Sequence, residues 1–302
     1  MYLAEHFVQP PQWTWYILFY FFFAGLAAGA YVLGTLLRFS GDPRDEPAAS
    51  IAFLVSFPAT VICPVLLTAD LGVSWWKFWH MMVDVTPGEA GPIFHYWSPM
   101  STGAWALFVF GVFVFVSAAE AWLSDRRGAP FLPAALGRLI AIVGSLLGLF
   151  IASYTGVLLS VSNQPVWSDT WTLGGLFLAS GLSGAAALIT LLVRYRPEAG
   201  VSLARLRVAD GYFSILELAL LIAFFITVAL AGGAGRILPW IPLWIIAVAG
   251  MVASLLGFRR PARVTATGET VAAPVAMEAT IVSVVVLVAV LALRAAVIFS
   301  AQ

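Results

Sequence analysis

The stretch WTWYILFYFFFAGLAAGAYVLGTLLRF, residues 13–39, decides the fold, because its apolar run exceeds the ~20 residues that a helix needs to cross a bilayer. Seven more stretches of this kind follow along the sequence. They lie at residues 50–73, 101–123, 134–161, 171–193, 211–231, 238–258 and 279–300. The sequence therefore predicts an all-α integral membrane protein with eight transmembrane helices.

Composition favours the same class of protein. Hydrophobic residues make up 62% of the chain, charged residues make up 10%, and the formal net charge is zero. These values exclude a basic nucleic-acid-binding protein and leave little material for a soluble domain. Residues 1–12 lack a basic region, and the apolar run after them is too long for a signal peptide. We therefore expect a first membrane helix there and no cleaved leader.

The basic residues predict an orientation. The connections after the first, third, fifth and seventh helices, with their flanks, hold twelve arginines, whereas the remaining connections hold only Lys77 and Arg236. Basic residues concentrate on the cytoplasmic side of a membrane protein. We therefore expect a protein of the bacterial cytoplasmic membrane whose two chain termini both lie on the outer side.

The helices are expected to form two four-helix bundles. Residues 1–12 are an outer N-terminal segment, residues 13–161 the first bundle with an outer loop at 73–100, and residues 162–302 the second bundle. The outer loop has aromatic residues at near-helical spacing before a Pro-Gly turn, which predicts a short helix in the membrane interface. Residues 259–278 are rich in Thr, Ala, Val and Gly and are expected to be a flexible link.

Tryptophans and small residues suggest where the helices meet other partners. Eleven of the twelve tryptophans fall towards the predicted outer side. An aromatic belt alone, or a belt together with a protein docking surface, explains this excess. Small residues at four-residue spacing predict close helix contacts. They are Gly25 and Gly29 in the first helix, and Gly144, Gly148, Ala152 and Gly156 in the fourth.

Several kinds of site are not supported by the sequence. The three histidines, His6, His80 and His95, lie in outer segments, so we expect no haem held between the spans. Cys63 is the only cysteine, which excludes an intrachain disulfide and an iron–sulfur cluster or zinc site built from cysteines of this chain alone. No phosphate-binding glycine loop and no His-Glu zinc motif is present.

Ionisable residues inside the spans are functional candidates, because each costs about 2.5–3.5 kcal/mol to insert at mid-helix. Asp70 lies near the outer end of the second helix, Glu217 in the inner half of the sixth, and Arg294 towards the outer end of the eighth. Glu217 and Arg294 are placed to form a proton path from the inner side. The alternatives are an arginine that pairs helices and a structural glutamate bound to an inner arginine such as Arg194.

Two phenols lie at one level. Counted at 1.5 Å per residue, Tyr20 and Tyr154 both lie about 10 Å below the outer boundary. Asp70, Ser98 and Ser101 lie slightly above them. These groups suit hydrogen bonding to the carbonyl oxygens of a quinone whose tail lies in lipid. The alternative is that the phenols only cap helix contacts.

Five segments of the sequence resemble the membrane subunits of the polysulfide reductase, or NrfD-like, family. They are YFFFAGLAAGA at 20–30, LLTADLG at 66–72, WSPMSTGAW at 97–105, YTGVLLS with PVW between 154 and 167, and LRAAVIF at 293–299. The resemblance implies eight membrane helices without haem, and menaquinone or ubiquinone bound near the outer face between the first four helices. It also implies electron exchange with a ferredoxin-like iron–sulfur subunit on the outer face, beside a catalytic molybdenum-type or cytochrome subunit.

The resemblance also assigns roles to residues. Tyr154 matches the quinone-contacting tyrosine of the fourth helix, Tyr20 stands where the polysulfide reductase members carry a histidine, and Ile17 stands where they carry a polar residue. The resulting hypothesis is a quinone-binding subunit in which Tyr154, Tyr20 and Asp70 place the head group and help proton transfer. The rival hypotheses are a secondary transporter, with proline-broken helices, and a membrane anchor that binds no quinone.

Overall fold

The computed structural model describes residues 9–88, 90–258 and 277–302, and its long helices confirm the predicted all-α membrane fold. Each predicted stretch corresponds to one helix, and all eight are long and apolar enough to cross a membrane. These helices are α1 (Trp15–Arg38), α2 (Glu46–Asp70), α3 (Pro99–Arg127), α4 (Ala134–Ser160), α5 (Leu173–Val193), α6 (Leu203–Leu230), α8 (Ile241–Phe258) and α9 (Met277–Phe299). The protein is therefore a multi-pass membrane protein.

The largest difference from the predicted boundaries concerns α6. This helix begins at Leu203, whereas the apolar stretch begins at residue 211. The residues between carry two arginines and Asp210, so a criterion based on apolar runs excludes them. The backbone nevertheless continues as helix, because Leu206 is buried against the neighbouring helices and a charged first turn does not break a helix. Asp210 consequently lies inside the helix and not in a loop.

Local sequence signals explain why α3 starts and stops where it does. Ser98 precedes the helix in an extended conformation, and its side chain accepts a hydrogen bond from the Ser101 amide at 3.4 Å. Pro99 occupies the first helical position, where its missing N–H costs nothing. Gly128 ends the helix at φ 67°, in the left-handed region that glycine adopts without strain. This start of α3 is the part of the fold on which the candidate site depends.

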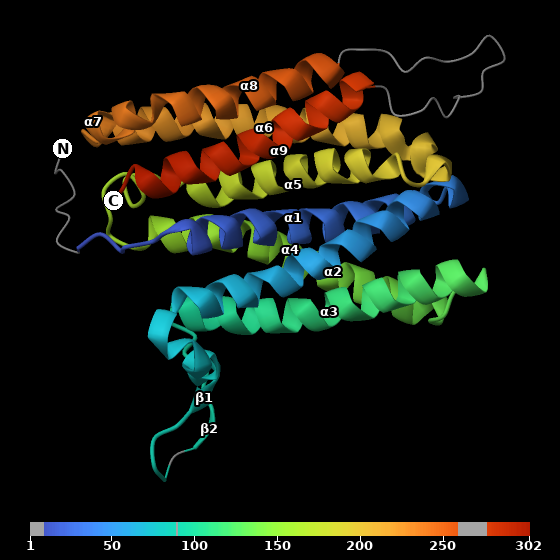
Figure 1. The fold of residues 1–302 in the computed structure, drawn as a ribbon, viewed down its shortest axis with the longest axis horizontal. Helices are drawn as coiled ribbons and strands as arrows, with labels where there is room; N and C mark the ends of the chain where they lie inside the picture. Colours follow the sequence, from blue (N-terminus) through green and yellow to red (C-terminus); the bar gives the residue numbers. More distant parts are fainter. Residues whose placement is uncertain (1–8, 89, 259–276) are drawn as a thin grey trace.

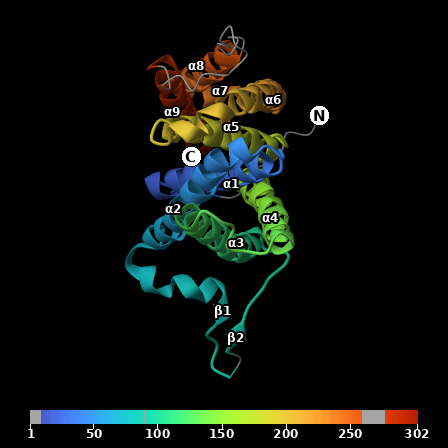
Figure 2. The same ribbon diagram turned by 90° about the vertical axis from the view of Figure 1, so that its right-hand side faces the viewer.

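The helices α1 and α5 occupy the middle of the molecule. Figure 2 shows α2, α3 and α4 on one side of this pair and α6, α8 and α9 on the other. Extensive contacts join α1 to α2, α4 and α5, and join α5 to α4, α6 and α9. The two sets of helices thus share a continuous packed centre. A division of the chain at residue 161 into two bundles that act separately stays a prediction.

Glycines allow α1 and α5 to approach closely. A side chain added at Gly181 would lie 3.0 Å from the Gly25 carbonyl oxygen, and one added at Gly29 would meet the Gly181 carbonyl. In α4, Gly156 faces the backbone of α5 at Leu173 in the same way. The structure therefore confirms that the predicted small residues lie at helix contacts.

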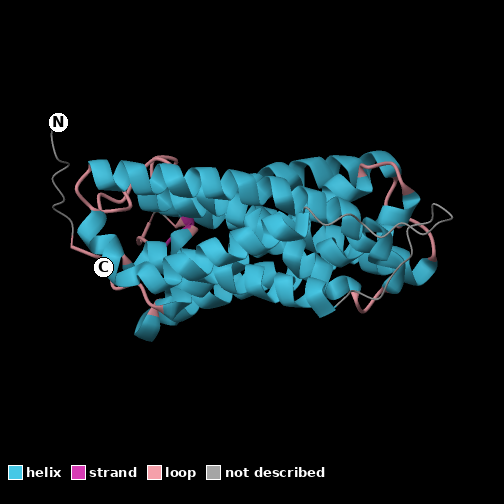
Figure 3. Cartoon of the chain, turned by 90° about the horizontal axis from the view of Figure 1, so that it is seen from above, coloured by secondary structure: helices cyan, strands magenta, loops and turns pink. Residues whose placement is uncertain are grey.

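The molecule has two distinct ends. Figure 1 shows that α1 begins and α9 ends at one end, which we call the terminal end, and Figure 3 shows the loops gathered at both ends of the long helices. The opposite end carries Arg38, Arg126 and Arg196 among other arginines, and we call it the arginine-rich end. Which end faces the outside is still a prediction from the arginine asymmetry.

Ion pairs join the two sets of helices at the arginine-rich end. The Asp45 carboxylate is buried and accepts hydrogen bonds from Ser202 at 2.7 Å and Ser40 at 2.6 Å, and it pairs with Arg205. Arg196, which follows α5, lies 2.5 Å from Asp125 at the end of α3. These contacts connect the turns after α1 and α3 with the turn after α5.

The connection between α2 and α3 projects from the terminal end as an arm, visible in Figures 1 and 2. We call residues 71–98 the aromatic arm. It contains a 3-10 helix at Gly72–Met81 and two short antiparallel strands, β1 (Val83–Asp84) and β2 (Gly91–Pro92). The predicted short helix is therefore present, whereas the strands leave no signal in the sequence because two residues show no alternation.

The remaining connections contain short helical turns. They are the 3-10 turns at Pro43–Asp45, Pro197–Ser202 and Leu238–Trp240, and the short helix α7 (Ala234–Ile237). The predicted flexible link at 259–278 lies, except for its last two residues, outside the described residues, as does most of the N-terminal segment 1–12.

Candidate functional site

Tyr154 is held at the junction of α3 and α4. Its hydroxyl donates a 2.6 Å hydrogen bond to the carbonyl oxygen of Pro99, the first residue of α3. Its ring stacks on Phe150, with 5.6 Å between the ring centroids, and fills the space left by the missing side chain of Gly103. The phenol is 7% exposed. Tyr154 is therefore a buried hydrogen-bond donor whose present acceptor is a backbone carbonyl.

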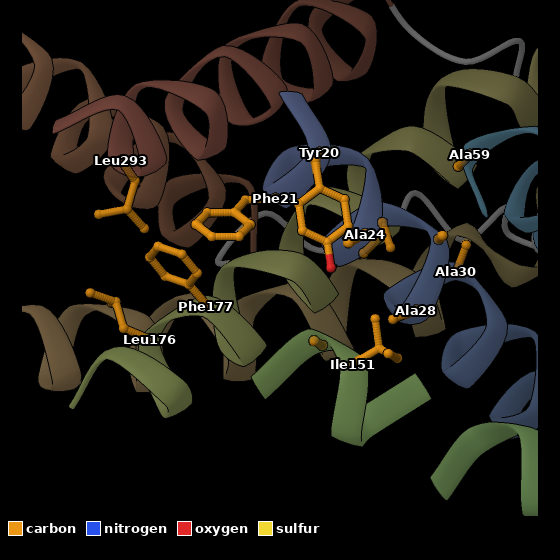
Figure 4. Packing of buried hydrophobic residues seen from close by; sticks show 14 of the residues in the cluster. Tyr20, Phe21, Ala24, Ala28, Ala30, Ala59, Ile151, Leu176, Phe177 and Leu293 are labelled. Atoms are coloured by element: carbon orange, nitrogen blue, oxygen red, sulfur yellow. The ribbon is translucent and has the colours of Figure 1, made fainter. Parts of the chain in front are cut away.

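Tyr20 lies beside Tyr154 from the other side. Tyr20 belongs to α1, is 5% exposed, and has the Cys63 thiol of α2 and the Tyr154 phenol as electrostatic neighbours. Figure 4 shows Tyr20 on the side of α1 that faces Ile151 of α4, and its ring also contacts that of Phe21, with 5.4 Å between the ring centroids. The four helices α1 to α4 thus meet around these two phenols. The predicted common level of Tyr20 and Tyr154 agrees with this arrangement.

The two candidate serines lie next to Pro99. Ser98 caps α3, and the Ser101 hydroxyl accepts a hydrogen bond from the His95 amide at 3.1 Å. Both hydroxyls therefore hold the backbone of the turn that supplies the acceptor for Tyr154. In this arrangement they position Pro99, and each hydroxyl still has lone pairs or a proton for another partner.

Asp70 stands apart from the phenols. It is the exposed last residue of α2, seven residues beyond Cys63, so it lies about 10 Å further along the helix towards the terminal end. No hydrogen bond joins Asp70 to Tyr20 or Tyr154 in the described parts of the chain. The structure therefore brings together Tyr20, Tyr154, Ser98 and Ser101, and leaves Asp70 at the rim.

Arg294 is fully buried in the centre of the molecule. Its Nε donates to the Phe21 carbonyl of α1 at 3.0 Å, and one terminal nitrogen donates to the Ser180 hydroxyl of α5 at 2.8 Å. The guanidinium also lies 5.0 Å from the ring centroid of Phe177 and donates to the carbonyl of that residue at 3.3 Å. Figure 4 shows Phe21 and Phe177 meeting beside Leu293, the residue before Arg294. Arg294 therefore joins α9 to α1 and α5.

Glu217 lies near the midpoint of α6 and is 3% exposed. Its electrostatic neighbours are Arg294 and Asp210. Arg194, the inner arginine considered as a partner from the sequence, instead donates to the Tyr195 hydroxyl at 2.7 Å on the surface. The charge that faces Glu217 is thus the buried arginine of α9.

Sequence reasoning missed one half-buried carboxyl group inside a helix, that of Asp210. The apolar stretch begins at 211 and so leaves this residue outside the sixth helix, although α6 begins at Leu203. A spacing signal is present, since Asp210, Ser214 and Glu217 stand at positions i, i+4 and i+7 and so share one face of a helix. Among the described residues, no three His, Cys, Asp or Glu side chains come close enough to hold a metal ion.

The sequence matches one family model over nearly its whole length and is similar to several known proteins over part of it. Residues 4–302 match the family model described as polysulphide reductase, NrfD. The C polypeptide of polysulfide reductase from Wolinella succinogenes is 28% identical over 73% of this chain and 71% of its own length. Protein NrfD of Escherichia coli is 28% identical over 78% of this chain and 76% of its own length. The C polypeptide of selenate reductase from Mesobacillus selenatarsenatis is 26% identical over 38% of this chain and 24% of its own length.

Proposed function

This chain belongs to the polysulphide reductase NrfD family, and from this premise we propose that it is the quinone-binding membrane subunit of an oxidoreductase complex. Two of the similar proteins are named as single polypeptides of larger reductases, which supports assembly with other subunits. One observation supports the quinone site above all others. Tyr20, Tyr154 and the first residue of α3 lie together inside the group of helices α1 to α4.

The residues around Tyr154 fit a quinone head group. A menaquinone or ubiquinone carbonyl is a hydrogen-bond acceptor, as the Pro99 carbonyl is, so it can replace that carbonyl as the partner of the Tyr154 hydroxyl. Tyr20 offers a second buried hydroxyl at the same level, and Ser98 and Ser101 hold the turn that would move aside. The quinone supplies the redox chemistry, in which quinol gives up two electrons and two protons on becoming quinone.

Residues of this chain would transfer the protons between the quinone and water. A phenol that is hydrogen-bonded to a quinone oxygen can give that oxygen its proton and then be reprotonated by a neighbouring group. In the reverse direction it takes the proton of the quinol oxygen as it releases its own to that neighbour. Asp70, exposed about 10 Å further along α2, is placed to exchange such protons with water at the terminal end. In this proposal Tyr154 and Tyr20 orient the head group and Asp70 serves proton exchange at the rim.

The electron partner is proposed to dock on the aromatic arm. Six of its tryptophan, phenylalanine and tyrosine side chains are more than half exposed, a composition typical of the buried core of protein interfaces. They are Trp75, Trp76, Phe78, Phe94, Tyr96 and Trp97. The partner would be a ferredoxin-like iron–sulfur subunit, accompanied by a catalytic molybdenum-type or cytochrome subunit.

Charged groups border this surface. Lys77 carries a positive charge, and the hydroxyl and amide of Thr86 donate hydrogen bonds to Asp84, which hold the pKa of the Asp84 carboxyl below its usual value. Asp84 is therefore ionised at neutral pH, and the two residues would be rim contacts. The arm lies at the terminal end and leads directly into Pro99, the residue bound by the Tyr154 hydroxyl. A partner docked there would keep its cluster close to the quinone.

The distribution of basic residues supports an orientation in the membrane. The terminal end would face the outside of a bacterial cytoplasmic membrane, and the arginine-rich end would face the cytoplasm. Quinone chemistry near the outer face moves no charge across the membrane by itself. Glu217 and Arg294, buried in the middle of the molecule, would supply the proton path from the inner side that coupling requires.

Purification from a native membrane followed by lipid extraction and mass spectrometry tests the proposal. An iron–sulfur subunit and a quinone that both co-purify with this chain are the expected result. Recovery of the subunit without quinone would leave only a membrane anchor, and recovery of neither would favour a secondary transporter. A matched preparation of an unrelated membrane protein from the same cells controls for quinone carried along in bulk lipid.

A further inference from the structure

A cavity of about 490 Å³ lies at the arginine-rich end, away from the proposed quinone site. Its walls come from α5, α6, α8 and α9, which Figure 2 shows grouped together on one side of α1. Most of the lining is apolar, including Ala187 and Val286. Polar lining residues include Arg207, Asp210, Ser254 and Glu278. A carboxyl group is costly to place in a largely apolar cavity within a membrane protein, so Asp210 is a candidate functional residue.

Asp210 is bound on both oxygens by serine hydroxyls. The Ser183 hydroxyl of α5 donates to one carboxylate oxygen at 2.6 Å, and the Ser254 hydroxyl of α8 donates to the other at 2.6 Å. Asp210 itself is half-buried and lines the cavity, whereas both serines are buried. The carboxyl group is thus fixed between three helices and open to the cavity.

A row of polar groups leads from Asp210 into the interior. The Ser214 hydroxyl lies 2.8 Å from the Ser254 hydroxyl, and both are buried. Asp210, Ser214 and Glu217 share one face of α6, and this face covers about 10 Å of helix. Glu217, at the far end of the row, faces Arg294.

We propose that this cavity is the place where protons are taken up from the arginine-rich side, and that Asp210 is the carboxyl group that passes them towards Glu217. The inference rests on the proposed coupling of the quinone chemistry. A hydronium ion that enters the cavity from the arginine-rich side gives a proton to Asp210 and leaves a neutral water molecule. Asp210 gives its proton to the Ser254 hydroxyl, which releases its own proton to Ser214, and Ser214 does the same towards Glu217. Each transfer leaves every hydroxyl with one proton, turned towards Asp210 as in the structure, and moves one positive charge inward. The hydroxyls turn back before the next proton passes.

Charged groups stand at both ends of the path. Arg207 of α6 and Glu278 of α9 stand with Asp210 in the cavity wall, and α5 and α8 contribute serines at this level. At the inner end of the path, Arg294 has its hydrogen bonds to α1 and α5. Arg294 is thus a cation that faces Glu217 at the inner end of the path.

The test uses the complete complex in liposomes. Asp210→Asn keeps the size of the side chain and one acceptor oxygen, and its amide nitrogen can donate to the second serine once that hydroxyl turns. The amide group cannot take up and pass on a proton. We expect quinone turnover to stay within about twofold of the parent while the membrane potential generated per turnover falls by at least about tenfold, as for loss of a group in acid–base transfer. Glu198→Gln, which changes an exposed carboxylate at the same end, should leave both quantities unchanged.

A second pair of variants separates proton transfer from folding. Ser254→Ala removes the hydroxyl between Asp210 and Ser214, and Ser254→Thr restores one. Loss of potential in the first variant and recovery in the second supports the path. Equal potential per turnover in the parent and in both Asp210→Asn and Ser254→Ala overturns it. A parent complex that oxidises quinol without any potential overturns the path and leaves the quinone site standing.

A chemical readout does not depend on turnover. Dicyclohexylcarbodiimide reacts with protonated carboxyl groups that it reaches through apolar surroundings. It should therefore label Asp210 in the intact complex, and more strongly as the pH falls. Peptide mass mapping with fragmentation should find an adduct on residue 210 in the parent and none on residue 210 in Asp210→Asn, and it separates this adduct from any on Glu217 in the same peptide. Protection of Asp210 by sodium ions, but not by potassium ions, would make the cavity a sodium site and overturn the proton assignment.

Discussion

The Tyr154 hydroxyl lies 2.6 Å from the Pro99 carbonyl oxygen, so the fourth transmembrane helix is tied to the first residue of the third. Tyr20 of α1 and Cys63 of α2 complete the same neighbourhood. A buried phenol that already binds a carbonyl oxygen is prepared to bind another one. The same contact therefore contributes to stability and defines where a quinone carbonyl would be accepted.

Tyr154→Phe removes this hydrogen bond and keeps the ring. We expect a loss of about 0.5–1.5 kcal/mol in the free energy of unfolding. Quinol turnover should fall by a larger factor, because the head group loses the donor that aligns it. Steady-state quinol oxidation and thermal unfolding in detergent measure the two effects. Tyr16→Phe, an exposed tyrosine of the same end, should change neither, and unchanged kinetics in both Tyr154→Phe and Asp70→Asn would contradict the site.

Arg294 should be a main determinant of stability. Arg294→Lys keeps the charge but loses the forked hydrogen bonds to α1 and α5, which predicts a loss of about 1–3 kcal/mol in the free energy of unfolding. Arg294→Leu also leaves Glu217 without its cation, which predicts a loss of about 3–5 kcal/mol.

Unfolding in detergent, followed by the near-ultraviolet signal, measures these losses. The exposed Arg236 provides the control, since Arg236→Lys should have no effect. In a double-mutant cycle, Glu217→Gln should recover part of the stability lost in Arg294→Leu. Strict additivity of the two changes would show that Glu217 and Arg294 do not interact.

Gly25 should tolerate no side chain. A Cβ atom at Gly25 would collide with a terminal nitrogen of Arg294 and lie 3.4 Å from the Gly181 Cα atom, so Gly25→Ala should cost about 1–3 kcal/mol through overpacking. Gly137→Ala is the matched control in α4, because its added atom meets nothing within 4 Å and alanine favours helix. Equal melting temperatures for the two variants would disprove the close crossing of α1 and α5.

The proposed orientation is testable with single cysteines. The native Cys63 is fully buried and should stay unlabelled by a membrane-impermeant maleimide. A cysteine replacing the exposed Val85 of the aromatic arm should react in intact spheroplasts, whereas one replacing the exposed Glu198 should react only after permeabilisation. Reaction of both from the same side would contradict the predicted topology.

Docking on the aromatic arm makes a further prediction. Lys77 is the only lysine of the chain, so an amine-reactive crosslinker should join the iron–sulfur partner to this residue. Trp97→Ala should weaken binding of the partner by about tenfold or more, as expected for a buried interface tryptophan. Trp122→Ala, at the arginine-rich end, is the control. A partner that crosslinks only through the N-terminal amine, with affinity unchanged by Trp97→Ala, would place the interface elsewhere.

The amino-acid sequence was sufficient for the properties that depend on one segment at a time. The length of each apolar run predicted all eight helices, and their order predicted that Tyr20 and Tyr154 reach a common level. Small residues at four-residue spacing marked the helix contacts correctly, because backbone approach requires a missing side chain wherever it occurs. These are local rules, and a membrane makes them strict, since every backbone polar group in lipid must be satisfied within the helix.

The partners of the buried polar groups were settled by packing in three dimensions. Arg294 meets Phe21 and Ser180, residues more than a hundred positions away in the sequence, and nothing in the local sequence distinguishes these acceptors. The predicted sixth helix began after Asp210, because the charge of this residue ended the apolar run, whereas the structure places Asp210 inside α6. Folding places the Ser183 and Ser254 hydroxyls on its two oxygens, and these hydrogen bonds offset the cost of holding a carboxyl group inside a membrane helix.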